Sequence, residues 1–329
     1  MGPNERTDDT FLLNKEKLLC SINSVIQNRP KSSIHFFVWG GEPLLHFSPL
    51  KQTISFLQDN FSQSKIAVST NGFLLQEKDR QDFILQSGIS LQLSCDGVAQ
   101  KIRSNYNPLE NSAVSIFLSE LARKNRLAIN CVMHKQNYSV NKNIDYFVSW
   151  MKKYSCLETN LDIRFTPFTE SDITPEFNFS GYELYTFLHE YEMLYVYALL
   201  GDKSRSELKH FVRFPLKIVR KSNIQKCDWA HSNMCAKYLL GSSDTSRHID
   251  TKGNFVSCNL IDSGILPRGK AKKEIPSYCN NCEFCGARGC YPCPAGDFTQ
   301  KCEWKKAWMQ FQKRMLLLRS LSKKFNKDK

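Results

Sequence analysis

Nine of the thirteen cysteines lie in the last third of the chain and could bind metal. They are Cys227, Cys235, Cys258, Cys279, Cys282, Cys285, Cys290, Cys293 and Cys302. Thiolates two residues apart can converge on one soft metal centre, because a tight turn brings both sulfur atoms to the same point. Four cysteines complete one iron–sulfur cluster or one structural zinc site, so nine could hold two centres and leave one spare. The spacing predicts metal ligation and leaves iron–sulfur and zinc open.

A disulfide framework is the alternative explanation for so many cysteines. It is disfavoured because the chain has 329 residues and does not open with the charged-then-apolar segment of a secretory signal. No apolar run approaches the roughly 20 residues needed to cross a bilayer. We therefore predict a cytoplasmic protein whose cysteines stay reduced and bind metal.

Three short apolar runs each end in a turn that carries small or polar side chains. The turns are Gly40-Gly41-Glu42-Pro43, Ser69-Thr70-Asn71-Gly72 and Ser94-Cys95-Asp96-Gly97, and Arg103 follows the third. Glycines let a ligand approach the backbone, a carboxylate accepts from an amine, small polar side chains bond hydroxyls, and an arginine clamps a carboxylate. Each turn alone is also typical of an ordinary β-turn. Together they offer an amine acceptor, ribose partners and a carboxylate clamp, the contacts that S-adenosylmethionine needs.

The elements that position these turns alternate between short apolar runs and helical patterns. Strands are predicted at 33–39, 65–69, 89–94, 127–133 and 161–166, and helices at 12–27, 48–61, 77–86, 111–124, 140–154 and 182–200. This alternation is typical of βα units around a parallel sheet, whose working residues lie at the carboxyl ends of the strands. The apolar run at 33–39 predicts a strand buried on both faces. Cys20, inside the first helix, is predicted to be buried packing.

The order begins with a helix, whereas a parallel barrel begins with a strand. In a barrel the first strand would therefore be missing, and the strand at 33–39 would present an open edge unless something covers it. The chain has a formal net charge of +13. That charge favours an acidic partner such as nucleic acid, an anionic membrane surface or an acidic peptide, and a solvated basic surface is the alternative.

At these residues the chain resembles radical S-adenosylmethionine (radical SAM) enzymes. The successive motifs of that superfamily are matched by Trp39 to Leu45, Ser69 to Gly72 and Ser94 to Gly97. The cysteine-rich part resembles the SPASM extension, which holds auxiliary iron–sulfur clusters, at Gly253 to Cys258, Cys279 to Cys282 and Cys290 to Gly296. The resemblance runs from about Leu12 to Trp304. It implies a partial (β/α)6 barrel that lacks its first strand, followed by a small cysteine-rich domain, and a peptide or protein as substrate.

The resemblance also implies site residues and boundaries. S-adenosylmethionine would be bound by Gly40, Gly41, Glu42, Ser69, Asn71, Ser94, Asp96 and Arg103. One auxiliary [4Fe–4S] cluster would take Cys227, Cys235, Cys258 and Cys293, and the other Cys279, Cys282, Cys290 and Cys302, with Cys285 able to replace Cys290. The segments would be a barrel at 1–200, a connector at 201–224, the SPASM-like domain at 225–303 and a basic helix and tail at 304–329.

The chain departs from that superfamily at the catalytic cluster. No CxxxCxxC motif occurs in the sequence, and without three thiolates no cluster with an open iron can bind and cleave the cofactor. The His-Asp pair that precedes the arginine in the family is absent near Arg103, and Asn259 replaces the Asp of the sulfatase-maturing branch.

Three functions follow from these matches and departures. The first is a peptide-modifying enzyme whose first strand and cluster loop are absent from this chain. They could have been trimmed, lost through a mis-assigned start, or supplied by another chain. The second is an inactive relative that binds a peptide or a partner enzyme. The third is a basic zinc-binding module for nucleic acid, which leaves the three strand-end turns unexplained. We expect the first, with this chain as written unable to cleave the cofactor.

Overall fold

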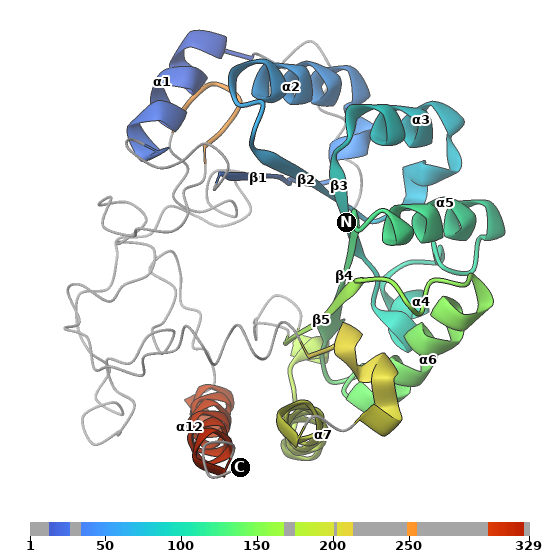
Figure 1. Cartoon of the computed structure of the whole chain (residues 1–329), viewed down its shortest axis with the longest axis vertical. Coiled ribbons are helices and arrows are strands. Elements are labelled where there is room, and N and C mark those ends of the chain that lie inside the picture. The colour runs from blue at the N-terminus through green and yellow to red at the C-terminus, as the bar shows by residue number, and fades with distance from the viewer. Residues whose placement is uncertain are drawn as a thin grey trace.

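The computed structural model describes residues 13–26, 34–167, 175–200, 203–212, 249–254 and 302–325. The predicted metal ligands from Cys227 to Cys293 lie outside these residues, and so does the side chain of Cys302. Within the described ranges the chain forms a five-stranded parallel sheet in the order β1-β2-β3-β4-β5. Figure 1 shows the sheet as a curved wall with α2, α3, α5 and α6 on its convex side.

The five predicted strands are all present. They are β1 (His35–Val38), β2 (Lys65–Thr70), β3 (Ser90–Ser94), β4 (Leu127–Met133) and β5 (Asp162–Pro167). Each pairs in parallel with the next along the chain, so every connection crosses over through a helical segment. The predicted α/β class is therefore confirmed.

The helices also follow the predicted order. The α-helices are α1 (Lys15–Ile26), α2 (Phe47–Asn60), α3 (Lys78–Ser87), α4 (Gln100–Arg103), α5 (Ser112–Arg123), α6 (Val140–Lys153), α7 (Gly181–Leu200) and α12 (Cys302–Phe325). Short 3-10 turns are η3 (Pro43–Leu45), η4 (Phe73–Gln76), η5 (Gly97–Ala99), η6 (Pro175–Phe177) and η7 (Lys203–His210). The side chains of Asn111 and Ser139 cap α5 and α6 by accepting from backbone N–H groups three residues on. No helix in the described part is long and apolar enough to cross a membrane.

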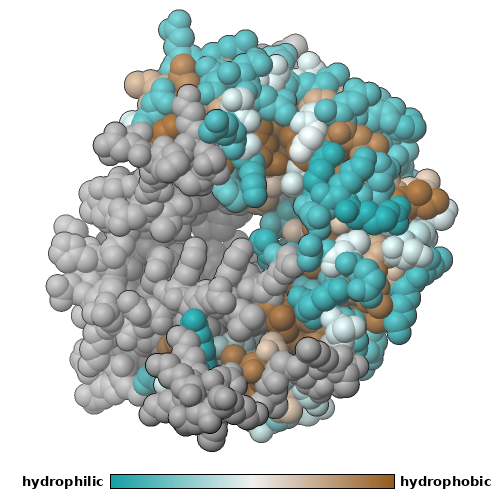
Figure 2. All heavy atoms as spheres, viewed as in Figure 1, coloured by the Kyte–Doolittle hydropathy of each residue, from teal (hydrophilic) through white to brown (hydrophobic). Residues whose placement is uncertain are grey.

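Alternate residues of β2 to β5 form the core beneath the helices. Val68, Leu93, Ile129 and Ile163 on that face are completely buried. The residues between them point to the concave face and are only half-buried. Figure 2 shows that the molecule is hollowed on this concave side. The period-2 burial expected for strands therefore separates an apolar outer face from a more accessible inner one.

Two predictions about burial are wrong. The strand β1 is not buried on both faces, because Phe37 is 43% exposed and Trp39, just after it, is 46% exposed. The reason is that β1 is the edge strand, and in the described part of the chain no strand covers its outer edge. Cys20 is exposed rather than buried, since Leu18 and Ile22 form the buried stripe of α1.

The segment 249–254 forms a turn that packs directly on α1. Gly253 adopts a φ of 77° there, and a Cβ on it would lie 2.6 Å from the Leu18 backbone nitrogen. The Asn14 N–H donates to the Thr251 carbonyl over 3.0 Å, and the Ser21 hydroxyl donates to the Gly253 carbonyl over 2.7 Å. The turn that leads toward the cysteine-rich part is thus fixed to the first helix.

Candidate functional site

The turns after β1 and β2 are joined by the carboxylate of Glu42. Its Oε1 accepts from the Thr70 hydroxyl over 2.9 Å and from the Leu44 N–H over 3.2 Å. Its Oε2 accepts from the Asn71 N–H over 2.8 Å. The Thr70 hydroxyl in turn accepts from the Gly72 N–H over 3.0 Å. Because the carboxyl ends of adjacent parallel strands meet at one edge, these contacts hold two of the predicted turns in one place.

Glu42 therefore acts as a clamp between loops. Burial raises the pKa of its carboxyl group, and the hydrogen bonds from Asn71, Leu44 and Thr70 and the charge of Arg103 oppose that rise. A carboxylate has about four acceptor positions, and three are used here. The sequence suggested that Glu42 would hold a ligand ammonium, and one acceptor position remains for that role.

Replacing Glu42 by Gln is expected to lower the free energy of unfolding by about 1–3 kcal/mol. An amide has a single acceptor oxygen, so it cannot accept at both Oε1 and Oε2. Because burial raises the pKa above its ordinary value of 4.5, the folded state binds the proton more tightly than the unfolded chain. The extra stability from holding the buried carboxyl group protonated is therefore full below pH 4.5 and is lost as the pH rises through the raised value. The three hydrogen bonds to the carboxylate offset part of that loss.

Urea denaturation of the two proteins between about pH 4 and pH 7 measures this contribution. The part of the pH dependence of the unfolding free energy that comes from Glu42 should disappear in the Gln variant. The matched control is Glu158→Gln, because the Glu158 side chain is 87% exposed and only its pairing with Lys209 would be lost. Equal stability of wild type and the Glu42 variant across the range would contradict the clamp.

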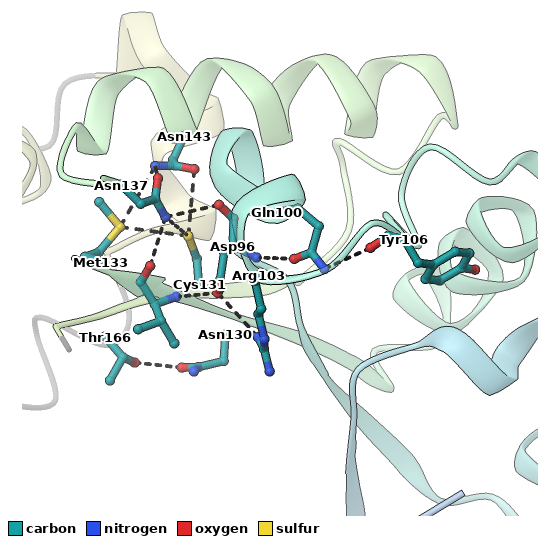
Figure 3. A network of polar contacts seen from close by, with 11 residues as sticks. Asp96, Gln100, Arg103, Tyr106, Asn130, Cys131, Met133, Asn137, Asn143 and Thr166 are labelled. Carbon is teal, nitrogen blue, oxygen red and sulfur yellow. Dashed lines mark hydrogen bonds and ion pairs between the residues drawn. The ribbon is translucent and has the colours of Figure 1, made fainter. Parts of the chain in front are cut away.

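The turn after β3 is tied to β4 by Asp96. Asp96 is buried, and its Oδ1 accepts from the Val132 N–H over 3.0 Å and lies 3.5 Å from Nη1 of Arg103. Its own N–H donates to Oε1 of Gln100 over 2.8 Å, and Asn137 donates to its carbonyl over 3.1 Å. Figure 3 shows these contacts converging where β3 and β4 end.

Arg103 contacts Asp96 through only one long bond, and its side chain is 40% exposed. Its remaining guanidinium donors have no hydrogen-bond partner among the described residues. Arg103 is thus held near the site with most of its donors available, as a carboxylate clamp requires.

A row of polar side chains lines the concave face below these turns. In the strand register Ser94 pairs with Asn130, and Asn130 pairs with Arg164. Arg164 forms an ion pair with Asp162 at 2.8 Å, and its Nη1 donates to Gln92 over 3.4 Å. Closed parallel barrels usually fill this space with branched apolar side chains. A polar lining suits a polar ligand instead.

The sequence analysis missed most of this lining. The missed residues are Gln92, Asn130, Asp162, Arg164 and Thr166, of which Thr166 donates to Asn130 over 2.6 Å. The signal was the strict alternation inside β3 and β5, where polar residues alternate with apolar ones. Oδ1 of Asp162 is buried and has no hydrogen-bond partner among the described residues. Such an orphaned acceptor suits a ligand donor.

Two cysteines beside the site, Cys95 and Cys131, are buried in the core. Burial raises the pKa of Cys95 to about 12 and raises that of Cys131 as well, so both stay protonated at neutral pH, whereas a metal ligand must be a thiolate. In the described ranges no group of three His, Cys, Asp or Glu could hold a metal ion. The predicted metal ligands from Cys227 to Cys293, and the side chain of Cys302, lie outside what the structure describes.

Searches with protein-family models and among curated proteins find no match for this chain. Solved structures do match. One is anSMEcpe with bound AdoMet, with a TM-score of 0.54, 16% identity, and coverage of 94% of this chain and 89% of that chain. Another is anSMEcpe with AdoMet and the Kp18Cys peptide, with a TM-score of 0.55, 16% identity, and coverage of 94% and 91%. A third is SuiB of Streptococcus suis bound to S-adenosylmethionine, with a TM-score of 0.48 and 14% identity. That match covers 87% of this chain and 66% of that chain.

The structural match fits the resemblance that the motifs suggested. At 16% identity the likeness concerns the fold. The chain therefore shares the fold of anSMEcpe, and the resemblance that the motifs suggested is confirmed at the level of the fold.

Proposed function

We propose that this chain is a radical SAM/SPASM-like protein that acts on a peptide or protein. S-adenosylmethionine would bind where β1, β2 and β3 end, and auxiliary iron–sulfur clusters would occupy the cysteine-rich part. The observation that carries the proposal is that the three predicted turns follow adjacent parallel strands at one edge of the sheet. Glu42 joins the first two turns, and Asp96 ties the third turn to β4. The fold match to a protein solved with both AdoMet and a peptide supports the same cofactor and substrate class.

The residues at this edge fit the cofactor. A Cβ on Gly40 or Gly41 would meet no atom within 4 Å, so room exists beside the backbone there. Ser94 ends β3 half-buried, and no hydrogen bond to its hydroxyl occurs in the described part of the chain. The amine would bind near Glu42, the ribose near Ser94 and Asp96, and the carboxylate at Arg103. When bound and reduced by a cluster, the cofactor supplies hydrogen-atom abstraction.

The absence of CxxxCxxC from this sequence limits what the chain does alone. We propose that it binds S-adenosylmethionine and does not cleave it without a cluster loop from elsewhere. The outer edge of β1, which no strand of the described ranges covers, is the place for such a partner. In parallel sheets the segment before a crossover helix pairs beside the strand that follows it, and the helix α1 precedes β1 directly.

The test is anaerobic reconstitution of the full chain with iron and sulfide. We expect about eight irons per chain, because two four-iron clusters would form. We also expect AdoMet to bind, with 5′-deoxyadenosine after dithionite at the level of a protein-free control. Stoichiometric zinc without labile sulfide would overturn the clusters, and catalytic 5′-deoxyadenosine would overturn the predicted inactivity. Tighter binding of duplex DNA than of acidic peptides at physiological salt would favour a nucleic-acid module instead.

A further inference from the structure

The imidazole ring of His210 is buried at the end of η7, against the loop at 154–161 that joins α6 to β5. His210 is 1% exposed. Its Nδ1 lies 3.0 Å from the carbonyl oxygen of Leu161, and its Nε2 lies 2.8 Å from the carbonyl oxygen of Leu157. Both distances are those of a hydrogen bond. Each ring nitrogen of His210 therefore contacts a different carbonyl group of the same loop.

These two contacts require two protons on the ring. A backbone carbonyl oxygen only accepts hydrogen bonds, so the ring nitrogen must be the donor in both contacts. A neutral imidazole has one N–H group, whereas an imidazolium has two. In the neutral ring one nitrogen lone pair would face a carbonyl oxygen, and that carbonyl would lose the donor that a buried polar group needs. The geometry at His210 is therefore that of an imidazolium.

Ion pairs flank His210 on both of the elements that it joins. Lys209 on η7 donates to Oε2 of Glu158 in the loop over 3.3 Å. At the start of β5 Asp162 pairs with Arg164 at 2.8 Å. The two charges of each pair largely cancel at the distance of the ring. Neither pair therefore sets the charge of His210.

The other titratable groups near His210 are uncharged or favour the cation. Burial raises the pKa of Cys156 in the loop to about 11 and raises the pKa of Tyr191 on α7 as well, so both stay protonated at neutral pH. Glu207 lies one 3-10 turn before His210 on η7 and is half-buried. Burial disfavours a charged ring, whereas the two carbonyl groups and the charge of Glu207 favour it.

The contacts of His210 hold the segment 203–212 against the sheet. Leu208 and Phe211 on either side of it are also buried, and Phe211 stacks on Phe165 of β5 with ring centroids 5.6 Å apart. This segment belongs to the predicted connector at 201–224, which leads toward the cysteine-rich part. His210 thus adds two hydrogen bonds to an apolar contact at the start of that connector.

We propose that His210 is a buried imidazolium and acts as a pH-sensitive latch that holds the start of the connector on the loop at 154–161. An ordinary histidine loses its proton near about pH 6.5. When His210 releases its proton to water, one of its two hydrogen bonds breaks and one carbonyl group loses its donor. The latch is therefore closed at neutral pH and weakens in alkaline solution. It involves no cofactor, so it does not depend on the proposed function.

Urea denaturation of the full chain at pH 6 and pH 8 tests the latch. The folded state keeps a proton that the unfolded chain releases above about pH 6.5, so stability is full below that pH and is lost as the pH rises. Through His210 alone, the equilibrium constant of unfolding should rise at least about tenfold between the two pH values. His210→Gln should remove that rise, because glutamine does not titrate.

His134 offers a matched control with the opposite proton balance. It is also buried, but its Nδ1 accepts from the Gln136 N–H over 3.2 Å, so the ring has one proton and is neutral. Burial lowers the pKa of His134, and the charge of Asp96 opposes that change. Its stability contribution is present at pH 8 and is lost as the pH falls. His134→Gln should therefore steepen the rise in the unfolding constant between pH 6 and pH 8, whereas His210→Gln flattens it.

The protons on the ring can also be counted in the wild type by NMR of histidine labelled with nitrogen-15. At pH 7 both nitrogens of His210 should carry a proton, and only Nε2 of His134 should do so. This measurement needs no variant, so it decides the proposal even where His210→Gln fails to fold. A single proton on His210 at pH 7 would overturn the latch. So would an unfolding constant that responds to pH equally in the wild type and in His210→Gln.

Discussion

Replacing Gly97 by Ala is expected to lower the free energy of unfolding by about 2–5 kcal/mol. Gly97 has a φ of 58°, in the left-handed region, and a Cβ there would lie 2.0 Å from Oδ1 of Asn143. The left-handed backbone costs an L-residue about 1–2 kcal/mol. The collision adds about 1–3 kcal/mol, as overpacking in a core does.

Asn143 cannot move aside at low cost. It is completely buried, and its Oδ1 accepts from the Val98 N–H over 3.2 Å. Its Nδ2 donates to Oδ1 of Asn137 over 2.8 Å and to the Ser139 carbonyl over 2.9 Å. Figure 3 shows Asn143 and Asn137 beside Asp96. A shift of Asn143 would therefore break several buried hydrogen bonds.

Alanine variants of two other glycines separate the cost of the left-handed backbone from the cost of the steric collision. Gly88 has a φ of 71°, and a Cβ on it would meet no atom within 4 Å, so Gly88→Ala should cost only the backbone strain. Gly40 has neither feature, and Gly40→Ala should change stability by less than about 0.5 kcal/mol. In urea denaturation of the full chain, the loss of unfolding free energy should be largest for Gly97→Ala, smaller for Gly88→Ala and smallest for Gly40→Ala. In an Asn143→Ala background the Gly97 change should cost no more than the Gly88 change, and an unchanged cost there would contradict the collision.

The order of strands and helices could be predicted because each element carries its own pattern. The run from Leu127 to Met133 reads apolar at every second position, and the strand β4 has those bounds. Turn residues such as Asn71 and Asp96 identified the strand ends for the same reason. The exposure of β1 could not be read from its apolar sequence, since it depends on the neighbour that a strand has in the sheet.

The contacts inside the site could not be predicted from the sequence. The bond from Thr70 to Glu42 joins residues 28 apart, and the pairing of Arg164 with Gln92 joins residues 72 apart. Nothing in either local sequence indicates its partner. The helix α7 is similar, because its tyrosines look alike in the sequence until Phe165 and Phe311 pack on Tyr191. Tertiary packing alone decides which aromatic side chains of this helix are buried.

Replacing Gly41 by Val is expected to weaken S-adenosylmethionine binding by at least about tenfold and to leave the fold intact. A Cβ on Gly41 would meet no atom within 4 Å, and its φ lies outside the left-handed region. The free energy of unfolding should therefore change by less than about 0.5 kcal/mol. Gly41 precedes Glu42 directly, so the valine methyl groups would occupy the room beside the proposed amine site.

Equilibrium binding of S-adenosylmethionine to the anaerobically reconstituted full chain measures the effect. Gly181→Val is the matched control, because a Cβ on Gly181 would also meet no atom within 4 Å and Gly181 lies at the start of α7. That variant should bind as the wild type does. Undiminished binding by the Gly41 variant would show that the room at this turn does not hold the cofactor. A lower melting temperature would show that Gly41 serves the fold, and no binding by the wild type would reject the cofactor itself. Measuring binding and the melting temperature together therefore separates a role of Gly41 in cofactor binding from a role in the fold.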